Sequence, residues 1–93
     1  MGTNQFAGTR YVEFTAFPVN LVTDVLGPNN GTPAVEIIVT LVGGGVLVVT
    51  FADGTTSTIN NAGGLVGVPL SGLATDIEAA TDVGAVLVTW SYP

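Results

Sequence analysis

Short runs of β-branched and aromatic residues fill the chain, separated by clusters of Gly, Pro, Asn and Asp. No long segment has the period of an amphipathic helix. The run 10–17 alternates between two faces, with Val12, Phe14 and Ala16 on one and Tyr11, Glu13 and Thr15 on the other. This pattern predicts an all-β fold of about seven to eight short antiparallel strands, packed as a compact β-sandwich or a jelly-roll-like barrel.

Two apolar runs, 34–42 and 46–52, flank the glycines Gly43, Gly44 and Gly45. Because glycine adopts positive φ without steric cost, we expect a tight hairpin there. Both runs are apolar on both faces. One face of each belongs in the core, and the other needs cover from a loop or a second subunit.

Asp53 stands beside Gly54 in a chain with few charges, so it is a metal ligand, a catalytic carboxylate or a turn residue. It lies between the β-rich runs 46–51 and 55–59, where a short hairpin turn is expected. Asp accepts hydrogen bonds from local backbone N–H groups, and Gly accepts the left-handed conformation. We therefore predict that Asp53 is turn chemistry.

The segment 74–84 permits two interpretations. It is either a short helical turn with Thr75 as N-cap and Glu78 three residues on, or a strand followed by a turn at 81–84. We expect a strand containing Ile77. The run 85–92 reads as the last strand, with one face formed by Val86, Val88, Trp90 and Tyr92. The chain then divides into an extended N-terminal arm, 1–9, and a single β-sandwich domain, 10–93.

Composition adds an expectation of self-association. Apolar residues make up 47% of the chain and charged residues 9%, against about 25% charged in an ordinary globular domain. Such a surface is weakly solubilising, so we expect part of it to be covered by neighbouring subunits. The net charge is −6 with Arg10 as the sole cation. A basic stripe for phosphates is therefore impossible, which excludes nucleic acids and anionic membranes as partners.

The side chains available in this chain argue against an enzymatic function. His, Cys and Lys are all absent, so a nucleophile has no partner base except a carboxylate. A two-carboxylate glycosidase site stays formally open, but we predict neither catalysis nor a cofactor. Calcium is the one alternative, with Asp76, Glu78 and Asp82 as oxygen ligands. The competing interpretation is that these acids form a solvated edge that discourages aggregation. No signal peptide or membrane span is expected.

The C-terminal half resembles small head proteins of the spike-base type, found on tailed phages and gene-transfer agents. The matching features are the turn Ala52-Asp53-Gly54-Thr55, the pair Pro69-Leu70, the segment Leu73-Ala74-Thr75 with Ala80-Thr81, and the strand from Ala85-Val86-Leu87 to Trp90. The resemblance implies a β-sandwich accessory protein that sits on a capsid. The arm 1–9 would order on a neighbouring subunit or on the shell.

Together these observations predict a non-enzymatic virion protein, made in the bacterial host cytoplasm and placed on the outer capsid surface as a decoration or spike-base subunit. Its expected partners are the major capsid protein, further copies of itself in a trimer or pentamer, and a head fibre or spike. The interface residues we expect are Phe6, Arg10, Ile38, Val42, Trp90 and Tyr92. The alternative function is a carbohydrate- or calcium-binding module of a phage tail or adhesin.

Overall fold

The computed structural model describes residues 9–23 and 32–91. They form an antiparallel sheet and one short 3-10 helix, which confirms the all-β prediction. The elements are β1 (Thr9–Phe14), β2 (Val19–Asn20), β3 (Ala34–Leu41), β4 (Leu47–Phe51), β5 (Thr56–Ile59), η3 (Ala62–Leu65), β6 (Leu70–Ile77) and β7 (Ala85–Ser91). The strand in 74–84 contains Ile77, as expected, rather than a helical turn.

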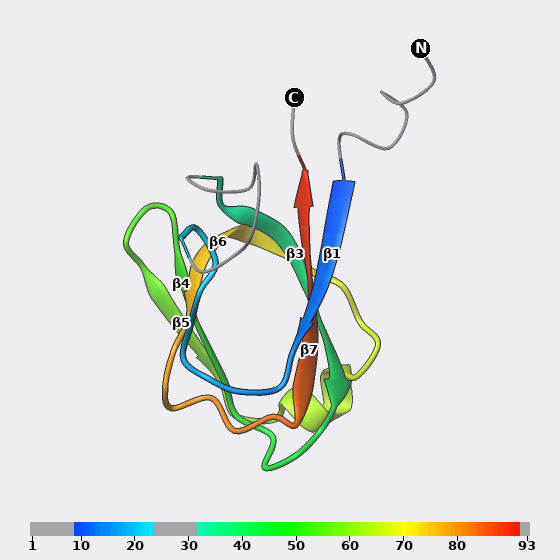
Figure 1. Ribbon diagram of the computed structural model, residues 1–93. Coiled ribbons are helices and arrows are strands. Elements are labelled where there is room, and N and C mark those ends of the chain that lie inside the picture. The colour runs from blue at the N-terminus through cyan, green and yellow to red at the C-terminus, as the bar shows by residue number, and fades with distance from the viewer. Residues whose placement is uncertain (1–8, 24–31, 92–93) are drawn as a thin grey trace.

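One seven-stranded sheet curls around the core, with six of its strands in the order β1-β7-β3-β6-β4-β5 and β2 off this path. Figure 1 shows β4 and β5 on one side of the molecule and β1 and β7 on the other. The short strand β2 pairs with the second half of β6, next to the part of β6 that pairs with β3. The expected compact sandwich or barrel is thus a single sheet folded over on itself. Among the described residues, β1 and β5 are the two end strands of this order, and the two-residue strand β2, which pairs with β6 alone, is a further short edge.

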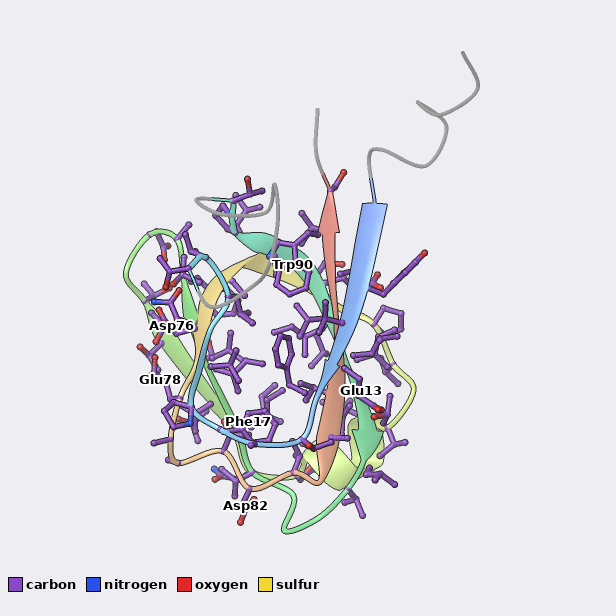
Figure 2. All side chains as sticks on the ribbon, in the orientation of Figure 1. Glu13, Phe17, Asp76, Glu78, Asp82 and Trp90 are labelled. Atoms are coloured by element: carbon purple, nitrogen blue, oxygen red, sulfur yellow. The ribbon has the colours of Figure 1, made fainter. Side chains whose placement is uncertain are left out.

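Trp90 fills the centre of this curl. Its side chain has 0% exposure, and its indole N–H donates to the Leu21 carbonyl at 3.0 Å. The Phe14 ring packs edge-on against it, with 6.2 Å between ring centroids. Figure 2 shows Trp90 directed into the interior. The prediction that Trp90 lies at an interface is therefore wrong in this fold, because the curled sheet and the chain after β2 enclose the whole ring.

The glycine loop between β3 and β4 is not a hairpin, contrary to the prediction. β3 pairs with β6 and β7, whereas β4 pairs with β5 and β6. The loop instead packs against the segment before β7, since Gly44 N–H donates to the Asp82 carbonyl and Gly84 N–H to the Leu41 carbonyl, both at 2.8 Å. A Cβ atom at Gly43 or Gly44 would overlap Asp82. The glycines are needed for this close approach.

This contact predicts that Gly44→Ala destabilises the protein. The added methyl must displace the Asp82 carboxylate, so we expect the free energy of unfolding to fall by about 1–3 kcal/mol. Gly64→Ala is the matched control, because its Cβ would meet nothing nearer than 3.8 Å, and surface changes of this kind stay within about 0.5 kcal/mol. Urea unfolding of both variants measures the difference. Equal stabilities of the two variants would contradict this account of the loop.

Candidate interaction surface

Of the three carboxylates considered as calcium ligands, Asp82 lies apart from Asp76 and Glu78, and each accepts a hydrogen bond from another group of the chain. Asp82 Oδ1 accepts the Val46 N–H at 2.7 Å, and Glu78 Oε2 accepts the Thr50 hydroxyl at 2.6 Å. Figure 2 shows Asp82 at one end of the molecule, away from Asp76 and Glu78. Within residues 9–23 and 32–91, no group of His, Cys, Asp or Glu is arranged to hold a metal ion. The geometry therefore gives the calcium alternative no ligand set.

Asp53 performs the turn chemistry predicted for it. Its Oδ1 accepts both the hydroxyl of Thr55, at 2.6 Å, and the backbone N–H of Thr55, at 3.0 Å. Gly54 takes a φ of +89°, which completes the β4–β5 turn. The Thr55 hydroxyl bond, followed by the Thr55 backbone bond, lowers the pKa of the exposed Asp53 carboxyl below its ordinary value. The sequence motif Ala52–Thr55 is thus a structural turn in this protein.

A mixed apolar and acidic surface covers the outside of β1, β7 and β3, and we call it the outer face. Val12, Val88 and Ile37 point into the core, so the alternate positions of these strands point outward. Register places these positions in two rows, which run Tyr11–Thr89–Glu36 and Glu13–Leu87–Ile38.

The outer face differs from the usual polar, solvated face of a sheet in two ways. It exposes apolar side chains, and its charged side chains are carboxylates. Tyr11 is 65% exposed, and Ile38 and Leu87 are half-buried beside it. Glu13 accepts the Thr40 hydroxyl at 3.2 Å, and within the described part of the chain no side chain forms a hydrogen bond or ion pair with Glu36. No ion pair occurs among the described side chains. The outer face therefore presents apolar groups flanked by the carboxylates of Glu13 and Glu36.

A buried hydroxyl lies at the middle of the outer face. Thr89 is 8% exposed, and its Oγ1 has no hydrogen-bond partner. Tyr11 and Glu36 flank it on the neighbouring strands. A buried hydroxyl without a partner costs free energy, so this position is not optimised for the stability of the isolated subunit.

Thr89→Val tests that statement. Valine keeps the shape and removes the unpaired hydroxyl, so we expect the free energy of unfolding to stay unchanged or to rise by up to about 1 kcal/mol. The matched control is Thr81→Val. Thr81 is 6% exposed, and its hydroxyl bonds both the N–H and the carbonyl of Val48, so its loss costs about 1–3 kcal/mol. Thermal and urea unfolding measure both variants. A loss at Thr89 as large as that at Thr81 would show that the Thr89 hydroxyl has a partner.

The remaining predicted interface residues are placed as follows. Ile38 lies half-buried on the outer face, and Val42, 47% exposed, follows β3 at the glycine loop. Arg10 lies in β1, paired with Trp90. Phe6 and Tyr92 lie outside the described residues.

Sequence reasoning did not select several apolar side chains that the structure exposes. These are Tyr11, Leu41, Val66, Val68 and Leu73, all more than two-fifths exposed. Tyr11 had a signal, since the alternation of 10–17 already placed it opposite Val12 and Phe14. Leu41 lies at the end of β3, and Val66 and Val68 lie in a connection, where periodicity says little. Leu73 lies inside β6, but the sequence around it does not alternate regularly between apolar and polar residues.

An open hollow of about 640 Å³ is lined by Phe51, Ala52, Asp53, Thr55 and Leu73. A separate, small apolar cavity of about 50 Å³ opens between β3, β4, β5 and β6. Its lining includes Ile37, Leu47, Val49, Phe51, Ile59 and Leu70. Binding pockets for drug-sized ligands are about 300–1,000 Å³. The cavity is therefore too small for a sugar ring or a comparable ligand.

Comparison of the chain with family models, with curated proteins and with solved structures gave no match. The described part of the chain contains no helix with the length and hydropathy needed to cross a bilayer. The features of this chain that bear on its function are therefore the outer face, the exposed apolar side chains and the net charge.

Proposed function

We propose that the chain is a non-enzymatic structural subunit of a phage virion, which oligomerises on the outer surface of the capsid and binds the major capsid protein. The observation that carries this proposal is the outer face of β1, β7 and β3. A largely exposed Tyr11 beside half-buried aliphatic side chains is a surface that a partner protein stabilises by burying it.

The charge of the outer face favours a partner that supplies cations. Glu13 and Glu36 lie on either side of the apolar side chains, and this chain offers only Arg10 to a carboxylate. A capsid protein with Lys or Arg at its outer surface would pair with both acids and cover Tyr11. The net charge of −6 also favours the exterior of a shell, since packaged DNA repels an acidic protein from the interior.

The motifs that resemble spike-base head proteins support the same proposal. The segment Ala52–Thr55 forms the β4–β5 turn, Leu73–Thr75 lies in β6, and the run from Ala85 to Trp90 lies in β7. These three motifs lie in elements of one sheet, and β6 and β7 both pair with β3.

The residues proposed for the alternative function, a carbohydrate- or calcium-binding module, are not placed for binding in this fold. Trp90 is fully buried and cannot form a sugar platform. Asp82 lies apart from Asp76 and Glu78. No observation on the described residues favours the alternative.

Co-sedimentation tests the proposal. On this proposal, the purified chain should pellet with capsids assembled from the major capsid protein of the phage that encodes it. Tyr11→Ser should weaken that binding by about tenfold or more, because a largely exposed aromatic side chain that an interface buries carries a large share of the binding free energy.

Leu73→Ser is the matched control, since Leu73 is 55% exposed but lies in β6, outside the outer face. Both variants should unfold at the same temperature as the unmodified chain, so lost binding is not lost folding. A protein that stays in the supernatant and is a strict monomer at high concentration would refute the proposal.

A further inference from the structure

The edge strand β5 has an unprotected side. It pairs with β4 alone, and no described segment covers its other edge in Figure 1. Natural proteins blunt such an edge with Lys, Pro, a bulge or an inward charge. The four residues Thr-Ser-Thr-Ile of β5 contain none of these, and their pairing with β4 runs without a register shift. β5 is therefore a regular, uncharged template for another strand.

The backbone groups that face this free edge follow from the register. Phe51 N–H donates to the Thr55 carbonyl at 2.8 Å, so residues 51 and 55 form a hydrogen-bonded pair. Hydrogen-bonded and non-hydrogen-bonded pairs alternate along an antiparallel ladder. Ser57, opposite Val49, therefore bonds to β4. Thr56 and Thr58 direct their N–H and C=O groups away from the sheet.

We propose that β5 pairs antiparallel with β5 of a second copy, about a twofold axis at Ser57. In this register, Thr56 lies opposite the partner's Thr58, and Thr58 lies opposite the partner's Thr56. All the unpaired backbone groups of both threonines then meet, because each such pair exchanges both of its hydrogen bonds. Ser57 lies opposite the partner's Ser57 as a non-hydrogen-bonded pair.

The side chains of β5 favour a second copy as the occupant. The register brings hydroxyl residues opposite hydroxyl residues on the same face, a pairing that stabilises sheets. Two subunits of net charge −6 repel each other, but no carboxylate lies on the strands that meet. The nearest acids are Asp53, in the turn before β5, and Glu78, which is bonded to Thr50 one strand further in. The other edge strand, β1, carries Glu13 and Arg10 and lacks this neutral strip.

This inference builds on the self-association in the proposed function, but it does not depend on the capsid. It states which element joins two copies, and it leaves the outer face of each subunit free for another partner. The two surfaces belong to strands at opposite ends of the sheet order, since β5 ends the order that β1 and β7 begin.

Cysteine cross-linking gives the positive test. The chain has no cysteine, so single-cysteine variants report on one position each. Opposite residues in a non-hydrogen-bonded pair lie about 4.5 Å apart between Cα atoms, within the ~4.4–6.8 Å range of disulfides. Ser57→Cys should give a disulfide-linked dimer under mild oxidation. Ala79→Cys, exposed in the turn after β6, is the control and should stay a monomer.

A proline variant should abolish the proposed contact between the two β5 strands. Thr58→Pro removes an N–H that points away from β4, so the pairing with β4 is retained. The mass in solution should fall from that of a dimer to that of a single 9.4 kDa chain, with the β-sheet circular dichroism spectrum unchanged. If Thr58→Pro does not fold, the Ser57→Cys result alone decides.

The proposal is overturned if Ser57→Cys cross-links no faster than Ala79→Cys, or if folded Thr58→Pro still sediments as a dimer. The co-sedimentation assay separates this failure from failure of the proposed function. Monomeric Thr58→Pro that still pellets with capsids supports capsid binding through the outer face. If the wild-type chain is a dimer that does not pellet with capsids, the β5 contact is supported and the capsid role is refuted.

Discussion

Scarcity of charge is the constraint on which the structure depends. With one cation and seven carboxylates, the chain has few ion pairs to make and folds through backbone hydrogen bonds and apolar contacts. The acids act locally as acceptors: Asp53 organises the β4–β5 turn, Asp82 binds the Val46 N–H, and Glu78 binds the Thr50 hydroxyl. The same scarcity leaves β5, an edge strand, without a charged side chain. Because the chain has few charged side chains, part of its surface is apolar or uncharged, and we propose that partner proteins cover this part.

The curled sheet explains where those surfaces lie. The chain leaves β1 at one edge and crosses to β2 on β6, while Trp90 bonds Leu21 just after β2. This crossing lies across the open side of the curled sheet (Figure 1). Apolar residues beyond the capacity of the interior remain outside, Tyr11 and Leu73 among them. Two edges also remain, because the sheet order begins at β1 and ends at β5.

The sequence predicted correctly those features that depend only on residues close together in the chain. Alternation in 10–17 identified β1 and its inward face, and the Asp53-Gly54 pair identified a turn, because both depend on neighbours within a few residues. The prediction of a hairpin at the glycine loop was wrong because this loop depends on residues that are distant in the sequence. Gly43 and Gly44 look like a hairpin, but their small size serves contact with Asp82 and Gly84, far along the chain. Trp90 failed likewise, since only the assembled curl shows that its ring is enclosed. The separation of Asp76 from Asp82 equally depends on tertiary structure.

Amide hydrogen exchange along β5 tests the central claim most directly, namely that this charge-poor surface is completed by other copies of the chain. Ser57 N–H bonds to β4 within one subunit, so the account predicts slow exchange at every protein concentration. Thr56 and Thr58 N–H should exchange fast in dilute protein and slowly in concentrated protein. Fast exchange of both threonine amides at all concentrations, with Ser57 protected throughout, would show that the edge stays open to water and would contradict the account.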